Sequence, residues 1–559
     1  MRNVTMFEDA KEALGYDTGD LLRPTDSGSH HPENPEDLSS VSEWLALEKA
    51  KRLHAHYVYF RRFEGRPSQP LFYVYDYTED MGLPNESELV LLWHFNPKVG
   101  LGVQMGKRWR ILGWEKKLIG CCWKYAGLFK VYRRGNADCF GQYLCGLFHE
   151  GRHNIERMVE RIEGSDYDRL HHFISESPWG HAPVLQAVGR GLSALFVGRA
   201  GPVALIVDES GHRKSGDKSV GVARQYLGGI GKTDNGQVGV FAALAQGDDV
   251  GMVDVKLCLP KEWADSPKRC AKAGIPTLHQ KFKTKPRLAL EMIENLEGIV
   301  HCDWVGGDGA YGGSSELRKG IAALGRTFVL DVHENQLVHL GRPRPHIPDG
   351  PAGQGGKKNT YKSEKQEFMV KDLLPALPDG QWKTDTYRRG TKGGKTRQVV
   401  CLDVYIWNKS RAKTDAVEQL RLIVSREMDG SEIKYSVTND VARSNCAPCS
   451  EHQLLYRQMH RYWAERGIQD CKDTLGMTDY QVRTWRAWHR HITLTIMALH
   501  FMIEQKVAHE IQMPLLSCPD IKFFLAINLP RKVNNEQQAW EIIKKRHLLR
   551  QKDLDRWQT

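Results

Sequence analysis

An apolar run that ends in an acid, Val203 to Asp208 (VALIVD), constrains this chain more than any other stretch. Five apolar residues bounded by polar turn residues are typical of a buried strand. A carboxylate at the mouth of a buried strand is costly to desolvate unless a donor or a cation pairs it. Asp208 is therefore either a residue that caps a turn or part of a site for positive charge, and the later acids decide between these alternatives.

Two further strand patterns follow Asp208 closely. They lie at 219–226 (SVGVARQY) and 237–245 (QVGVFAALA), and glycines occur at three of the positions 228–231 between them. Glycines at such positions favour tight turns. The spacing predicts an antiparallel meander of three strands, the first of which carries Asp208.

A second acid has the same context. The stretch from Ile299 to Trp304 leads through Val305 and two glycines to Asp308. A helical pattern begins at Ser314, and 327–332 (TFVLDV) is the next strand pattern. Asp308 is thus predicted to follow a strand in the same way that Asp208 ends one.

A third acid lies in a helical stretch, 454–477 (LLYRQMHRYWAERGIQDCKDTLGM). Arg461, Glu465 and Lys472 are spaced 4 and 7 apart. On an ideal helix these three residues fall within about 40° of one another. Such a trio can be an ordinary solvated ion-pair surface. The alternative is that Glu465 joins the two earlier acids in one site.

This order of elements resembles an α/β fold with an RNase H-like core, in which a mixed sheet is flanked by helices. Asp208 would lie on the first strand, Asp308 after the fourth, and Glu465 on a late helix. Three carboxylates gathered in this way repel one another unless cations lie between them. We therefore expect these acids to bind two Mg²⁺ ions, for which Mn²⁺ can substitute. Two-metal sites hold the attacking and leaving oxygens of a phosphoryl displacement.

Several blocks of sequence resemble the DDE transposases of bacterial insertion sequences. They are DESGHRKSG at 208–216, KSVGVARQY at 218–226, GKTDNGQ at 231–237 and DGAYG at 308–312. The pattern R-x3-E-x6-K over 461–472 is similar to the tyrosine–arginine–glutamate–lysine signature of the branch that cuts through a DNA hairpin. The tyrosine of that signature would fall at position 458, where this chain has Gln458.

The resemblance implies a cut-and-paste DNA transposase with Asp208, Asp308 and Glu465 as its catalytic and metal-binding residues. Water would attack the phosphodiester at a transposon end, and the freed 3′-OH would attack either the opposite strand, as a hairpin, or the target DNA. The partners would be double-stranded DNA, at the terminal inverted repeats and at the target, and a second copy of the chain, because two ends must meet. A domesticated or regulatory DNA-binding relative without transposition activity is the alternative.

Basic residues are the expected contacts to DNA. The formal net charge of +11 favours a polyanionic partner. Residues 388–397 (RRGTKGGKTR) form a basic tip that either grips phosphate or is merely solvated. Trp382 and Trp407 lie in flanking strand patterns and are candidates to stack on an extruded base, although tryptophan in a strand is also typical of a core. The predicted DNA-binding residues are Arg461, Lys472, Lys214, Lys218, Arg224, Arg388, Arg389, Lys392 and Lys395.

The chain of 559 residues is long enough for several domains. It contains no apolar run of membrane-spanning length and does not start like a signal peptide, so we expect a cytoplasmic protein at the prokaryotic nucleoid, without membrane contact. The expected divisions are an acidic, disordered lead-in (1–40), a small α+β segment of unknown role and partner (41–95), a helical DNA-binding region (96–195), the first part of the RNase H-like core (196–335), a mostly β insertion domain (336–445), the second part of the core with the Glu465 helix (446–510) and a basic C-terminal tail (511–559).

Overall fold

The computed structural model describes most of the chain as two compact units. One unit comprises residues 1–124, 156–170 and 525–559, and the other comprises 125–155 and 171–524. The described residues are 57–61, 71–75, 90–92, 114–131, 134–346, 361–390, 393–407, 417–442, 447–511, 513–533 and 535–558. The predicted lead-in, residues 1–40, lies outside this set. All three predicted acids lie in the second, larger unit.

The smaller unit contains a three-stranded antiparallel sheet and several helices. The sheet has the order β1 (Tyr57–Arg61), β2 (Leu71–Tyr75), β3 (Val90–Leu92). Glu160 of α7 (Ile155–Arg161) pairs with Arg546 of α19 (Glu536–Gln558) at 2.6 Å.

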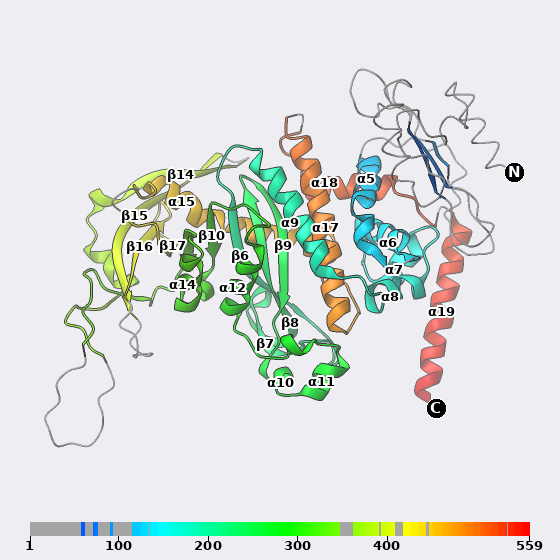
Figure 1. Ribbon diagram of the computed structural model, residues 1–559, viewed down its shortest axis with the longest axis horizontal. Coiled ribbons are helices and arrows are strands. Elements are labelled where there is room, and N and C mark those ends of the chain that lie inside the picture. The colour runs from blue at the N-terminus through cyan, green and yellow to red at the C-terminus, as the bar shows by residue number, and fades with distance from the viewer. Residues whose placement is uncertain are drawn as a thin grey trace, which may run out of the picture. The chain divides into compact units, whose positions relative to one another are not determined.

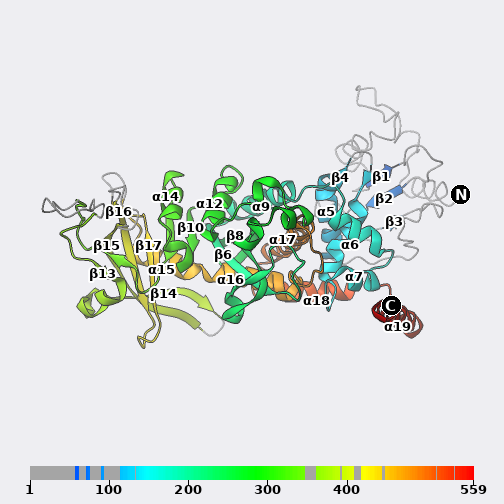
Figure 2. The same ribbon diagram turned by 90° about the horizontal axis from the view of Figure 1, so that it is seen from below.

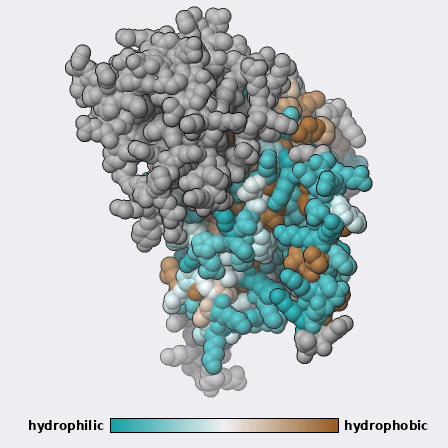
Figure 3. Space-filling model, turned by 90° about the vertical axis from the view of Figure 1, so that its right-hand side faces the viewer, coloured by the Kyte–Doolittle hydropathy of each residue, from teal (hydrophilic) through white to brown (hydrophobic). Residues whose placement is uncertain are grey.

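On the face drawn in Figure 3, hydrophilic residues predominate over the described surface, and apolar residues occur in small separate groups. None of the described helices combines the length and the apolar character that a membrane span requires.

A sheet of ten strands organises the larger unit (Figures 1 and 2). Its order is β14-β15-β16-β17-β11-β10-β6-β8-β7, with β9 also paired to β8. Strands β6, β10 and β11 are parallel neighbours, and the other pairings are antiparallel. The bounds are β6 (Ala204–Arg213), β7 (Ala223–Leu227), β8 (Lys232–Gln246), β9 (Asp249–Leu257), β10 (Trp304–Gly307), β11 (Phe328–Asp331), β14 (Lys383–Gly390), β15 (Gly393–Trp407), β16 (Val417–Arg426) and β17 (Ile433–Thr438).

The predicted meander exists, but its composition differs from the prediction. Strands β6, β8 and β9 form it, and the pattern at 249–257 is a strand that the sequence reading did not identify. The predicted middle strand, β7, pairs only with the N-terminal end of β8. A left-handed turn at Gly231, with φ of 64°, makes this short hairpin possible. Because β8 continues well beyond the hairpin, it reaches both β6 and β9.

The order β9-β8-β6-β10-β11 is consistent with an RNase H-like core. The predicted β-rich segment between the second and third acids continues the same sheet. Its last strand, β17, is antiparallel to β11, with Asp331 opposite Ser436. The segment is therefore joined to the core by backbone hydrogen bonds as well as by its chain connections.

Helices cover both faces of the sheet (Figure 2). Helices α12 (Lys285–Leu296) and α14 (Ser315–Ala323) pack on one face, and α15 (Glu451–His460) and α16 (Tyr462–Gln469) pack on the other. Hydroxyl side chains begin four of the described helices, because Thr284, Ser314, Ser450 and Thr484 each accept a hydrogen bond from a backbone N–H of the first turn. Helix α17 (Trp485–Ala508) is buried over most of its length against α9 (His181–Val197) and β9.

The predicted helical region 96–195 is described from residue 114 onward. Its helices are α5 (Trp114–Ala126), α6 (Ala137–Phe148), α7, α8 (Tyr167–Ser175) and α9. Outside this region, α18 (Cys518–Asn528) follows α17. Helices therefore occupy most of the described part of the region 96–195. Its role in DNA binding stays a prediction.

Candidate functional site

Strand register brings the first two predicted acids together. Val207 of β6 pairs with Gly307 of β10 in parallel register, so Asp208 and Asp308 follow side by side where this pairing stops. The prediction that Asp208 ends its strand was wrong, because β6 continues to Arg213 through its pairing with β8. Asp308 also begins the short helix α13 (Gly309–Gly312), where its Oδ1 accepts a hydrogen bond from the N–H of Ala310 at 2.9 Å. A Cβ at Gly312 would lie 1.9 Å from the carbonyl oxygen of Asp331, so only glycine allows this packing.

A third carboxylate, which the sequence reading missed, joins this pair. Single carboxylate oxygens of Asp208, Glu209 and Asp308 all lie within 4.8 Å of one another. Glu209 also accepts a hydrogen bond from Nζ of Lys285 at 2.6 Å. The only local signal for Glu209 is its place directly after Asp208 in the DESG block. An all-oxygen donor set of this kind is the one that Mg²⁺ and similar hard cations prefer, so the residues present fit a divalent metal.

The electrostatics of this acid cluster (Asp208, Glu209 and Asp308) also favour an added cation. Burial raises the pKa of Asp208 to about 7, and although Arg461 lowers it, the carboxylates of Asp308 and Glu465 raise it further. Burial likewise raises the pKa of Asp308, with a contribution from the charge of Glu209. A positive ion between the carboxylates would stabilise their charged forms and remove this cost.

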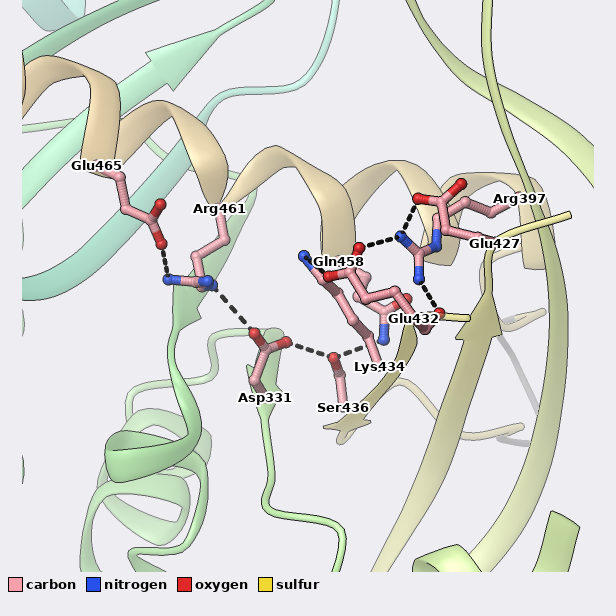
Figure 4. Close-up of polar contacts among 9 residues, drawn as sticks. All are labelled: Asp331, Arg397, Glu427, Glu432, Lys434, Ser436, Gln458, Arg461 and Glu465. Carbon is pink, nitrogen blue, oxygen red and sulfur yellow. Dashed lines mark hydrogen bonds and ion pairs between the residues drawn. The ribbon is translucent and has the colours of Figure 1, made fainter. Parts of the chain in front are cut away.

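Glu465, the third predicted acid, lies near the acid cluster but not in it. Its carboxylate contributes to the raised pKa of Asp208, and α16 packs against β6. Its side chain is half exposed, and Oε1 pairs with Nη1 of Arg461 at 2.7 Å (Figure 4). The structure thus brings two of the three predicted acids into contact distance, and the third reaches them only through Arg461.

The helix predicted over 454–477 is present in its first two thirds. Helices α15 and α16 join at Arg461, which itself has helical backbone angles. The stretch then changes to a π-helical turn, Asp470–Thr474, which shifts the ideal spacing before Lys472 is reached. Nζ of Lys472 lies 3.4 Å from the carbonyl oxygen of Gly211 in β6, and burial lowers its pKa. The predicted ion pair between Arg461 and Glu465 is therefore found, and Lys472 instead contacts a strand end.

The other predicted DNA contacts differ in exposure. Lys218, Arg224 and Lys395 are exposed. Lys214 is packed, because its Nζ lies 3.5 Å from the ring centre of Tyr480 and donates to the carbonyl of that residue at 3.0 Å. Burial lowers the pKa of Lys214 to about 8. Only the exposed residues are free to meet a DNA backbone without rearrangement.

The basic tip at 388–397 is partly occupied by contacts within the protein. The guanidinium of Arg388 stacks over Tyr462 at 4.7 Å and Trp463 at 5.4 Å, next to the Glu465 helix. Arg397, at the end of the tip, is buried and pairs with Glu427 and Glu432 (Figure 4). The side chain of Arg389 and all of Lys392 lie outside the described residues.

Neither candidate tryptophan presents an open ring face. Trp382 is buried, with the guanidinium of Arg426 over its ring at 4.0 Å. Trp407 is also buried, with the ring of His339 centred 6.3 Å away. This burial does not support a base-stacking role for either residue, because a strand position of this kind buries the ring among its neighbours.

Comparison with known proteins gives a family match, a curated relative and a similar solved structure. Residues 125–394 match the family described as DDE superfamily endonuclease. A protein described as "Probable transposase for insertion sequence element IS701", from Microchaete diplosiphon, is 29% identical over 230 residues, which cover 41% of this chain and 56% of that protein. The chain thus matches little more than half the length of this curated relative. A solved structure, a piggyBac transposase synaptic complex with hairpin DNA, shows 11% identity and a TM-score of 0.31, over 74% of this chain and 77% of that one.

The stretch that matches the DDE superfamily endonuclease family contains strands β6 to β11 of the mixed α/β sheet and the acid cluster. This match and the insertion-sequence relative point to an endonuclease of the DDE class, and transposase activity is a proposal. The hairpin-forming branch and its signature stay predictions.

Proposed function

We propose that this protein is a transposase that cuts DNA at the ends of an insertion sequence and joins those ends to target DNA. The observation that carries the proposal is the acid cluster, because three partly buried carboxylates at one sheet edge serve no evident purpose without a cation. Asp208 and Asp308 would hold divalent metal ions, with Mg²⁺ as the physiological choice. Such ions, when bound, would polarise the attacking oxygen and neutralise charge on the phosphate.

The chain's own residues have three tasks in this reaction. Asp208 and Asp308 form the fixed part of the site, because strand register sets their separation. Glu465 is the proposed third acid, and its half-exposed position on α16 leaves its carboxylate able to approach the cluster. Arg461 and Lys472 are the proposed contacts to the phosphate backbone, and positioning with charge neutralisation supplies most of the catalysis.

The finer steps of the proposal follow from the resemblance of the sequence motifs. The first cut frees a 3′-OH, which then attacks the opposite strand or the target DNA. A hairpin intermediate is the proposed route for the second strand. Two ends must be held together, so the active form is proposed to be a dimer on double-stranded DNA in the bacterial cytoplasm.

Cleavage assays on DNA that carries the terminal repeats of the element test the proposal. The wild-type protein is expected to cut this DNA in Mg²⁺ and to stop when the metal is chelated. Asp308→Asn is expected to bind the same DNA and leave it uncut. DNA binding without cleavage by the wild-type chain, at any concentration of Mg²⁺ or Mn²⁺, would instead identify a regulatory DNA-binding relative.

A further inference from the structure

Arg461 lies between three carboxylates and contacts them unequally (Figure 4). Its Nε is 3.0 Å from Oδ2 of Asp331, and its Nη1 is 2.7 Å from Oε1 of Glu465. The distance from Nη1 to Oδ2 of Asp208 is 3.9 Å, which is too long for a hydrogen bond. Arg461 is therefore bound to Asp331 and Glu465 and only approaches the acid cluster.

Asp331 is held in place by a short chain of polar side chains. It ends β11, and its Oδ1 accepts a hydrogen bond from Oγ of Ser436 at 2.6 Å. The same Oγ accepts a hydrogen bond from Nε2 of Gln458 at 2.8 Å. Ser436 and Gln458 are both buried, so these bonds are shielded from water. Gln458 occupies the position where the sequence signature would have a tyrosine.

We propose that Asp331 is a positioning residue that draws the Arg461 guanidinium toward β11 and away from Asp208. The inference rests on the proposed function, since it concerns the same metal site. With the charge of Asp331 removed, the guanidinium keeps only Glu465 as a close partner, and Asp208 becomes its next available carboxylate. A guanidinium bound to Asp208 would compete directly with a metal ion, because both need the same oxygen atoms.

The rival explanation is that Asp331 and Arg461 only stabilise the fold. A second buried ion pair in the same unit offers a matched control. Arg318 of α14 pairs with Glu418 of β16 at 2.8 Å, and the arginine side chain is 2% exposed. No ion pair among the described residues joins this pair to the acid cluster, although Arg318 also donates a hydrogen bond to the carbonyl oxygen of Gly312, at the end of the short helix α13. Glu418→Gln should therefore destabilise the protein without changing its affinity for metal.

The direct test is Mn²⁺ binding to the full chain without DNA, measured from the electron paramagnetic resonance signal of free Mn²⁺. Asp331→Asn is expected to weaken binding by about 10- to 100-fold, the scale for residues that orient metal ligands. Ser436→Ala should weaken it less. Removal of the guanidinium should cancel the effect, so Asp331→Asn is expected to change affinity by less than about threefold in an Arg461→Met background.

Each outcome supports or overturns the inference. Thermal unfolding of every variant reports whether it is folded, and Glu418→Gln gives the effect of losing a buried pair elsewhere. Wild-type affinity in folded Asp331→Asn would overturn the inference, as would an equal loss of affinity in the Arg461→Met background. If the wild type binds Mn²⁺ and responds to Asp331→Asn but cuts no DNA, the proposed function fails and the inference stands. If the wild type binds no Mn²⁺, both fail.

Discussion

Two regions of the large sheet contain buried charge and compensate it differently. In the region of β14–β17, the buried guanidinium of Arg397 is matched by the carboxylates of Glu427 and Glu432. Where the parallel pairing of β6 with β10 stops, three carboxylates meet, and the cations beside them are Lys285, which is 2.6 Å from Glu209, and Arg461, which is 3.9 Å from Asp208. A buried charge that is paired within the protein contributes to the folded structure. Buried carboxylates without enough paired cations instead indicate a site where the protein binds a positive ion.

The largest expected effect comes from removing one acid of the unmatched cluster. Asp208→Asn should lower the rate of DNA cleavage by at least about a thousandfold, because a lost metal ligand removes several kcal/mol of transition-state stabilisation. Gel-resolved cleavage of end-labelled DNA measures this rate. A variant that retained more than a tenth of the wild-type rate would show that the cluster is not the catalytic site.

In the region of β14–β17, loss of a buried charge should lower stability and leave DNA cleavage unchanged. Glu418→Gln leaves the buried Arg318 without its charged partner and should reduce the free energy of unfolding by about 3 kcal/mol. At a temperature where the variant is folded, its cleavage rate should equal that of the wild type. Denaturant unfolding and the cleavage assay measure the two quantities, and a strong loss of cleavage with intact folding would contradict the comparison.

The acid cluster should also make the metal-free protein less stable as the pH rises. The pKa of Asp208 is raised to about 7 in the folded protein, so the folded state binds more protons than the unfolded state between about pH 4 and 7. Stability is therefore lost over that window. Asp208→Asn should remove the contribution of Asp208 to this loss and stabilise the metal-free protein by about 4 kcal/mol at pH 8, since each pKa unit corresponds to about 1.4 kcal/mol. Denaturant unfolding in chelator at pH 5 and pH 8 checks this, and an equal pH dependence in both proteins would contradict it.

The smallest expected effect is on DNA affinity, which should depend on an exposed lysine more than on a packed one. Lys395→Ala should weaken DNA binding a few-fold and reduce the slope of log affinity against log salt by about 1, because one phosphate contact is lost. Lys214→Ala should leave that slope unchanged, since Lys214 is packed on Tyr480. Salt titrations of DNA binding measure both, and identical slopes for the two variants would contradict the assignment from exposure.

Local patterns in the sequence were enough to select Asp208 and Asp308, although β6 continues past Asp208 to Arg213. Asp208 and Asp308 each follow a short apolar run, and such runs are a property of the residues themselves. The pairing of strands was less predictable, because β9 carries Asp249 and Asp254 within an apolar pattern and its partner is chosen by contacts across the sheet. The antiparallel junction of β17 with β11 is likewise a long-range pairing that no local pattern encodes.

The residues around the acids were harder to identify than the acids. Asp331 follows apolar residues just as Asp208 does, so that signal was present in the sequence, but its role depends on Ser436 and Arg461 from distant segments. The two tryptophans were selected for their ring chemistry, which is the same in a core and on a surface. Only the packing of Trp382 under Arg426 distinguishes these two cases.

The central claim is that Asp308 is a ligand of the catalytic metal, and a change of metal preference tests it most directly. A thiolate binds Mg²⁺ poorly and accepts softer ions more readily. Asp308→Cys should therefore cut end-containing DNA very slowly in Mg²⁺ and should recover much of its activity in Mn²⁺, while the wild type cuts in both. Equal cleavage by Asp308→Cys in Mg²⁺ and Mn²⁺, or no recovery in Mn²⁺ by a folded variant that still binds DNA, would contradict the claim.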